Sequence, residues 1–156
     1  MDFELSEEQA MIKEAAHDFA QSEIVPVAAA HDASGEFPSQ TIAKAGELGF
    51  MGIEVPVEYE GAGRDAGSYA LLIEEIAAAD GAHSTIVSVN NSLYNNGIMS
   101  FGSDAQKQAF VAPIASGRAI GAYALTEPQS GSDSSHMRSR AVLSADGRHY
   151  EINANI

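Results

Sequence analysis

The sequence predicts an α+β fold that is mainly helical, with about five helices followed by the first strands of a β domain. Apolar residues recur at helical spacing from the N-terminus to about residue 118. From Ile120 onward they alternate with other residues, as in strands. Hydrophobic residues make up 45% of the 156-residue chain, which is enough for a packed core. We therefore expect a helical domain at 1–118 and the start of a β domain at 119–156.

The first helix begins at Ser6, because Ser6 can cap it and Gln9 completes a capping box. An apolar stripe at helical spacing follows, consisting of Ile12, Ala15, Ala16, Phe19 and Ala20. Pro26 should end or kink this helix. Residues 32–38 contain Gly35 and are expected to form a loop.

The second helix is expected at 39–48, where Gly49 would act as its C-cap. Residues 50–57 are apolar but are interrupted by glycine and proline, which predicts irregular structure. A third helix is expected at 68–79. Its buried face consists of Tyr69, Leu72, Ile73 and Ile76.

The fourth helix, 83–101, carries an unusual number of short polar side chains for a helix interior. They are Ser88, Asn90, Asn91, Asn95 and Asn96. These side chains either face solvent and neighbouring helices or line a pocket. A fifth helix opens with a second capping box, Ser103 with Gln106, and runs to about residue 115. Gly117 stops it, and Pro113 can distort its last turn.

Strands are expected at 120–125, 140–143 and 149–152, and residues 144–147 form a hairpin turn signal. Two or three strands are too few for an independent sheet. We therefore expect the polypeptide to be incomplete, with a helical domain and only the first edge of a β domain.

Charge and composition argue against nucleic-acid binding and against a metal site. The net charge is −14, and residues 1–80 carry all of it, with 17 acidic and 3 basic residues. Nucleic acid is therefore not an expected partner, and a phosphate-bearing ligand should prefer residues 81–156. The chain has no cysteine, and its five histidines show no metal-ligand spacing, so no metal site is expected.

No basic and apolar leader precedes the first helix, and no apolar run approaches the roughly 20 residues that cross a bilayer. We therefore expect a cytoplasmic protein without membrane insertion. Residues 61–66 match a Gly-x-Gly-x-x-Ala dinucleotide fingerprint. An ordinary interhelix loop is the better interpretation, because Pro56 breaks the preceding strand and nearby acids would repel a pyrophosphate.

Residues 123–133, YALTEPQSGSD, start as an alternating run and end in a loop. Pro128 forces extended geometry on Glu127 and ends the strand there. The following five residues supply two small hydroxyls, a glycine and free backbone N–H groups, so phosphate oxygens could approach the main chain. The alternative is an ordinary polar turn.

This string resembles the flavin-binding signature of the acyl-CoA dehydrogenases, aromatic-x-aliphatic-Thr-Glu-Pro-x-x-Gly-Ser-Asp. The resemblance extends from Leu5 to Tyr150 and looks closest to the short-chain, butyryl-type branch. Its flanking matches are 90–94, 101–103, 106–108, 115–117 and 140–142. It implies an orthogonal helical bundle followed by a β-barrel domain.

The resemblance also implies FAD as the cofactor and α,β-desaturation of an acyl-CoA thioester, with an electron-transfer flavoprotein as acceptor and a tetramer or dimer as the assembly. The implied flavin-binding residues are Tyr123, Ala124, Leu125, Thr126, Gly131 and Ser132. Ser132 would also contact the acyl-CoA. The helix carrying Asn90 and Tyr94 would border the acyl tail.

The family's catalytic glutamate is expected beyond residue 156, so no catalytic residue is assigned, and Glu127 is expected to be structural. After Tyr150 the expected glycine and lysine are replaced by Ala154 and Ile156, and the chain has no tryptophan for a flavin-stacking segment. We expect this chain alone to be inactive and to bind FAD weakly or not at all. Two alternatives remain, an acyl-CoA oxidase or other flavin-dependent relative, and a non-catalytic helical interaction module.

Overall fold

The structure, a computed structural model, describes residues 4–156, so residues 1–3 of the expected helical domain lie outside the described residues. The chain divides between Ala122 and Tyr123 into a helical unit and a smaller second unit. The predicted boundary lay at 118/119. Residues 119–122 stay with the helical unit because Ala119 N donates to Pro113 O at 3.0 Å and Gly121 N donates to Asn90 Oδ1 at 2.7 Å.

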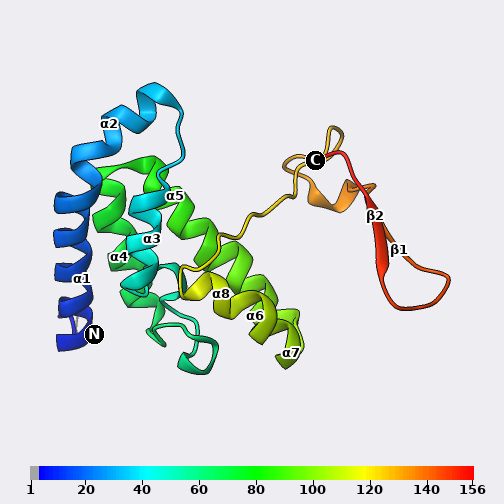
Figure 1. Cartoon of the computed structure of the whole chain (residues 1–156), viewed down its shortest axis with the longest axis horizontal. Coiled ribbons are helices and arrows are strands. Elements are labelled where there is room, and N and C mark those ends of the chain that lie inside the picture. The colour runs from blue at the N-terminus through cyan, green and yellow to red at the C-terminus, as the bar shows by residue number, and fades with distance from the viewer. Residues whose placement is uncertain (1–3) are drawn as a thin grey trace. The chain divides into compact units, whose positions relative to one another are not determined.

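Within residues 4–122, five helical rods build the first unit, which confirms the predicted number (Figure 1). Three of the rods contain a π-helical segment in their interior. In chain order the rods are α1 (Glu7–Phe19) with η1 (Ala20–Ile24) and α2 (Val25–Ser34); α3 (Ser39–Glu47); α4 (Ala66–Ala79); α5 (Gly81–Ser88) with η4 (Val89–Asn95) and α6 (Asn96–Phe101); and α7 (Asp104–Gln106) with η5 (Lys107–Val111) and α8 (Ala112–Ala115). Two short 3-10 turns, η2 (Phe50–Gly52) and η3 (Val57–Tyr59), lie between α3 and α4.

The predicted helix caps are confirmed. Ser6 and Gln9 form a complete capping box at α1, and Ser103 with Gln106 forms another at α7. Gly49 follows α3 with φ 78°, a backbone conformation that glycine adopts without strain. The starts of α4 and α5 lie two residues earlier than predicted, because Asp65 and Asp80 cap them.

The prediction of a loop from residue 32 was wrong, because the first rod continues to Ser34 and ends at Gly35, whose φ is 69°. Pro26 lies at the second position of α2, directly after η1. A proline inside an α-helix loses one backbone hydrogen bond and its ring clashes with the carbonyl four residues earlier. The wider π-helical turn before Pro26 relieves that clash, so the rod bends without ending.

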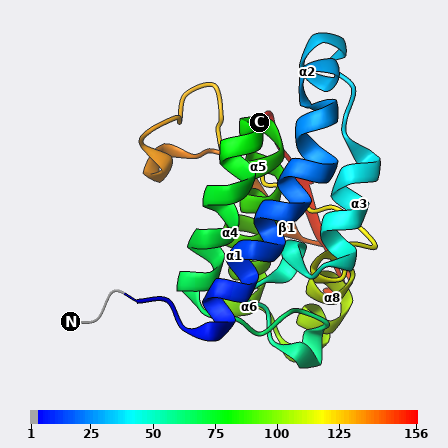
Figure 2. The same ribbon diagram turned by 90° about the vertical axis from the view of Figure 1, so that its left-hand side faces the viewer.

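The core of the helical unit lies between α1, α3, α4 and α5. Figure 2 shows α1 and α4 side by side, and these two helices form the largest helix–helix contact. The buried residues at its centre are Ala16, Phe19, Ile24, Ile42, Phe50, Met51, Ile53, Leu72, Ile76 and Val87. A smaller cluster of Val55, Val111 and Ala115 lies under η3 and α8.

The fingerprint-like loop at 61–66 connects η3 to α4. The amides of Ala62, Gly63 and Arg64 donate to carbonyls of residues 52–55 at 2.8 to 2.9 Å. No amide of these three is left for a phosphate, so the interhelix-loop interpretation is confirmed. Within residues 4–156, no helix has the length and apolar character needed to cross a membrane.

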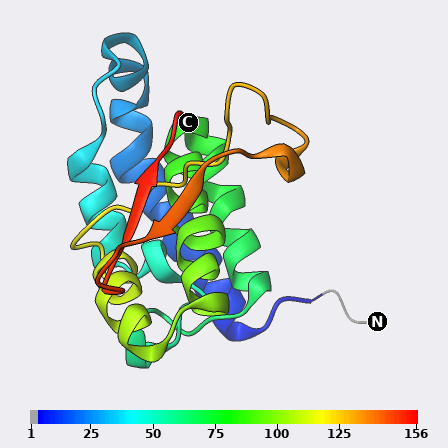
Figure 3. The same cartoon turned by 90° about the vertical axis from the view of Figure 1, so that its right-hand side faces the viewer.

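The second unit contains one hairpin, β1 (Arg140–Leu143) paired antiparallel with β2 (Tyr150–Asn153) (Figure 3). The register pairs Arg140 with Asn153 and Leu143 with Tyr150. The predicted turn is confirmed: Gly147 N donates to Ser144 O at 2.9 Å, and Gly147 has φ 68°. The predicted strand at 120–125 was wrong. These residues pair with neither β1 nor β2, the two strands of the described chain.

Candidate functional site

The segment expected to run along the flavin ring, 123–126, is extended and exposed. Tyr123 is 50% exposed and Leu125 is 37% exposed. Within residues 4–156, the main chain of this segment makes no hydrogen bond to another part of the chain. Its N–H and C=O groups are therefore available to a planar ligand that carries donors and acceptors along one edge.

A tight turn follows this segment. Glu127 N donates to Ser130 O and Ser130 N donates to Glu127 O, both at 3.0 Å. Pro128 and Gln129 form the tip of the turn between them. Glu127 and Ser130 are 5% and 2% exposed, although the residues around them face solvent. The two ends of the turn, its base, are therefore buried and hydrogen-bonded to each other, whereas its tip is exposed.

The Glu127 carboxylate holds this base together. It accepts hydrogen bonds from Ser139 N at 2.9 Å, Arg138 N at 2.7 Å and Gln129 Nε2. The side chain and amide of Ser139 and the amide of Arg138 lower the pKa of Glu127 to about 2, against the opposing effect of burial. A general base needs a pKa near the working pH. Glu127 is therefore unsuited to proton abstraction, and its expected structural role is confirmed.

Acidification tests the Glu127 clamp. Because folding depresses the pKa of Glu127, the stability that it contributes is fully present above the ordinary value of 4.5 and is lost as pH falls through about 2. We expect the amide resonances of Arg138 and Ser139 to shift together near that lower pH in an NMR titration. Glu127→Gln should show no such inflection. An inflection close to the ordinary value in the unmodified chain would contradict the clamp.

The next residues present free amides. Ser130 Oγ donates to Asp133 O at 2.8 Å, and Asp133 accepts from Ser135 N at 3.0 Å. Gly131 and Ser132 lie between these closed turns and are exposed. In the described part of the chain their amides have no acceptor, and an added Cβ at Gly131 would meet nothing within 4 Å. This open stretch of N–H groups and the Ser132 hydroxyl can bind phosphate oxygens.

In the helical unit, Asn90 and Tyr94 both contact Gly121. Asn90 is buried; its Oδ1 accepts from Gly121 N at 2.7 Å and its Nδ2 donates to Ile86 O at 2.8 Å. A Cβ at Gly121 would lie 2.4 Å from the Tyr94 ring. Both residues therefore fix where the chain leaves the helical unit, two residues before Tyr123. Contact of either residue with an acyl tail stays a prediction.

Asn91 and Asn95 brace an irregular turn, a role that the sequence alone did not identify. Asn91 Nδ2 donates to Phe50 O at 2.8 Å and Asn91 Oδ1 accepts from Ile53 N at 2.9 Å. Asn95 Nδ2 donates to Met51 O at 3.0 Å. Asn91 and Asn95 also line a cavity of about 340 Å³ together with Glu54, Val55, Pro56, Asn96 and Met99. Asn90, Asn91 and Asn95 are therefore buried against neighbouring backbone, and Asn91 and Asn95 also line a cavity, so both alternatives for this helix describe part of the structure.

Sequence reasoning missed Arg138 and Ser139 as partners of the site. Both donate to Glu127 from their main-chain amides, which carry no signature in the sequence, and the Ser139 side chain adds to the effect. The flavin-facing candidates and Ser132 belong to the second unit, whereas Asn90 and Tyr94 belong to the first. Across the described residues, no group of three or more histidine, aspartate and glutamate side chains is arranged to hold a metal ion.

Comparison with known proteins points to one family. The family described as "Acyl-CoA dehydrogenase, N-terminal domain" matches residues 6–118. The short-chain specific acyl-CoA dehydrogenase of Clostridium acetobutylicum is 41% identical over 155 residues, which are 99% of this chain and 40% of that protein. The chain therefore spans about 40% of the length of this curated relative.

Solved structures agree with the sequence comparison. A structure described as the electron transferring flavoprotein of Acidaminococcus fermentans matches with a TM-score of 0.93 and 42% identity, over 99% of this chain and 40% of that one. An acyl-CoA dehydrogenase from Bacillus anthracis, complexed with FAD, matches with a TM-score of 0.90 and 35% identity, over 97% of this chain and 26% of that one. These matches confirm the predicted fold class and the predicted resemblance.

Proposed function

Because the chain belongs to the acyl-CoA dehydrogenase family, we propose that it supplies the helical domain and the first flavin-binding segment of an FAD-dependent enzyme that desaturates a short-chain acyl-CoA. One observation carries this proposal. The main chain at 123–126 and 131–132 is exposed and internally unpaired, while the Glu127 clamp between them is fully bonded. The Glu127 clamp thus fixes the position of the flanking main chain, whose N–H and C=O groups remain free to bind a ligand.

The residues present fit FAD. The extended segment 123–126 offers N–H and C=O groups, and the Thr126 hydroxyl, to the polar edge of the flavin ring. The open amides of Gly131 and Ser132 suit the diphosphate, because they donate hydrogen bonds without a side chain in the way. FAD, when bound, would supply the hydride acceptor that no amino-acid side chain provides.

The role of these residues in the reaction is to position the cofactor and the substrate. Desaturation requires removal of the α-proton and transfer of hydride from the β-carbon, and both depend on alignment within a fraction of an ångström. The Glu127 clamp fixes the geometry of Gly131 and Ser132 but does not take a proton, since its pKa lies at about 2. We assign the base to a residue outside this chain.

The relatives favour a substrate class and a partner for the whole enzyme. The Clostridium acetobutylicum relative is named short-chain specific, which favours a short acyl-CoA. The Acidaminococcus fermentans structure is described as an electron transferring flavoprotein, which favours such a protein as electron acceptor. We further propose that Ser132 contacts the acyl-CoA, that Asn90 and Tyr94 border its acyl tail, and that the whole enzyme is a homo-oligomer.

Titration of the ¹⁵N-labelled chain with FAD tests the proposal. We expect weak binding, with amide shifts confined to 123–126 and 131–132, because only part of the flavin cradle is present. Gly131→Pro removes one donor and should weaken binding further. Gly131→Ala keeps the amide in open space and serves as the matched control. Shifts scattered over the helical unit, with none at 123–126 and 131–132, would argue against the flavin assignment.

A further inference from the structure

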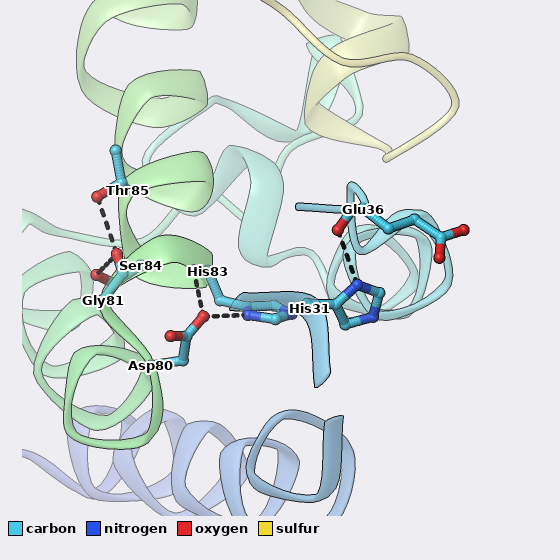
Figure 4. A network of polar contacts seen from close by, with 7 residues as sticks. All are labelled: His31, Glu36, Asp80, Gly81, His83, Ser84 and Thr85. Atoms are coloured by element: carbon cyan, nitrogen blue, oxygen red, sulfur yellow. Dashed lines mark hydrogen bonds and ion pairs between the residues drawn. The ribbon is translucent and has the colours of Figure 1, made fainter. Parts of the chain in front are cut away.

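A cavity outside the flavin segment lies between the end of α2 and the start of α5. Its volume is about 300 Å³, at the lower end of the range for small-molecule pockets, roughly 300 to 1,000 Å³. The residues that line it are Ala28, His31, Asp32, Gly35, Glu36, Phe37, Pro38, Asp80, Ala82, His83 and Ile86. Figure 4 shows the polar side of this cavity, where the rings of His31 and His83 lie next to each other.

His83, which lines this cavity, has one buried polar atom without a hydrogen-bond partner among the described residues. The residue is only 1% exposed. Its Nδ1 lies 2.5 Å from Asp80 Oδ2, and its backbone N donates to the same oxygen at 2.9 Å (Figure 4). Its Nε2 is buried without a hydrogen-bond partner within residues 4–156. A buried polar group of this kind costs stability unless a ligand or water satisfies it.

The partners of both rings determine which hydrogens these histidines carry. A carboxylate accepts only, so Nδ1 of His83 carries the proton and, in the neutral ring, Nε2 is an acceptor. His31 Nδ1 lies 2.8 Å from the carbonyl of Glu36, which also accepts only. The same reasoning makes Nε2 of His31 an acceptor. With both rings neutral, the cavity therefore offers lone pairs and favours a ligand that donates hydrogen bonds.

The charges around the cavity are negative. Asp32, Glu36 and Asp80 line it, and no lysine or arginine does. Within the described chain, Asp32 and Glu36 form no ion pair, so their charges are not compensated locally. An anionic ligand would be repelled. A cation that donates hydrogen bonds matches both the charge and the acceptors.

The remaining walls are apolar or aromatic. Ala28, Phe37 and Ile86 provide hydrocarbon surface, which suits a short alkyl chain. The His31 ring lies edge-on to the His83 ring, with centroids 6.3 Å apart and planes at 74°. The His31 ring thus lies against His83 and helps to screen it from solvent (Figure 4).

We propose that this cavity is a binding site for a primary alkylammonium group, which donates a hydrogen bond to His83 Nε2 while Asp32 and Glu36 balance its charge. The alkyl portion packs on Ala28, Phe37 and Ile86. Asp80 is a positioning residue, because it fixes the His83 ring and caps α5 without facing the ligand as a free charge. The site is independent of the flavin-binding segment and of the proposed enzymatic function.

NMR titration of the 156-residue chain with n-butylammonium at pH 8 tests the proposal. Two matched probes separate its components: tetramethylammonium has the charge but no donor, and 1-butanol has a donor but no charge. We expect saturable shifts at residues 31–37 and 80–86 with n-butylammonium. Each control ligand should bind more weakly by a factor of about ten or more, because a hydrogen bond to a charged group changes affinity by at least roughly this factor.

Four variants extend the test. His83→Phe removes the acceptor, keeps a ring, and should weaken binding about tenfold or more. Asp32→Asn removes an exposed charge and should weaken it roughly twofold to fivefold. His31→Ala uncovers the His83 ring and should strengthen binding. Asp18→Asn, which removes an acid on the surface of α1 outside this cavity, should leave the affinity unchanged.

The outcomes decide the proposal even if one variant does not fold. Equal affinity for n-butylammonium and tetramethylammonium would overturn the hydrogen bond, as would wild-type affinity in folded His83→Phe. If Asp32→Asn and Asp18→Asn changed the affinity for n-butylammonium equally, the ligand would be attracted only by the net negative charge of the chain. If His83→Phe fails to fold, the ligand comparison on the unmodified chain, together with His31→Ala and Asp32→Asn, gives the answer.

Discussion

Gly46→Ala is expected to lower the free energy of unfolding by about 3 kcal/mol, at the upper end of the range for overpacking. A Cβ at Gly46 would lie 2.4 Å from Gly117 Cα and 3.2 Å from Gly117 N. The obstructing atoms belong to the backbone, so no side chain can rotate away. Gly117 also has φ 75°, which fixes the chain locally. Either α3 or the end of α8 must therefore move.

Urea denaturation followed by circular dichroism measures this effect. Gly97→Ala is the matched control, because Gly97 lies in α6 and an added Cβ there meets nothing within 4 Å. Ala has the higher helix propensity, so the control should be neutral or stabilising by roughly 0.5 to 1 kcal/mol. Equal midpoints for the two variants would show that α3 and α8 adjust freely, contrary to the close contact.

Asn91→Ala is expected to lower the free energy of unfolding by a comparable amount, about 3 kcal/mol, through lost hydrogen bonds and not through steric overlap. Its Nδ2 donates to Phe50 O and its Oδ1 accepts from Ile53 N, and both of these residues lie in a buried turn. Truncation leaves these two groups without a partner, and each orphaned buried group costs roughly 1 to 3 kcal/mol. Hydrogen exchange at Ile53 should accelerate together with the loss of stability.

Asn96→Ala is the control for this variant, because Asn96 lies on the same rod but is exposed. Its effect should stay within about 0.5 kcal/mol, as for surface substitutions generally. The hypothesis fails if Asn91→Ala and Asn96→Ala unfold at the same denaturant concentration, since the asparagine would then contribute nothing through its buried contacts.

Local signals explain which parts of the fold were predictable. The capping boxes at Ser6 and Ser103 and the hairpin turn at 144–147 each depend on residues within four positions of one another. Their hydrogen bonds are decided by local geometry. The motif 123–133 was also recognisable, because its glycine, serines and Glu127-Pro128 pair are specified residue by residue.

The sequence shows where proline interrupts a regular α-helix, but it does not show whether the helix then ends or continues. Pro26 and Pro113 each follow a π-helical segment, η1 and η5, by two residues. The sequence indicates that a regular α-helix is impossible at these positions. Whether the chain then breaks or widens one turn depends on burial: Ala20, Ile24 and Val111 are buried, and continuing the rod keeps them so.

The sequence by itself determined the family, the helical rods with their caps, and the motif at 123–133, whose main chain at 123–126 and 131–132 the structure leaves without internal partners within residues 4–156. Only the tertiary structure decided that 120–125 forms no strand, that Glu127 clamps Arg138 and Ser139, and that three asparagines bond to distant backbone. The physical reason is the same in each case. A strand, a clamp or a buried amide needs a partner far along the chain, and residue spacing does not specify which partner will be in reach.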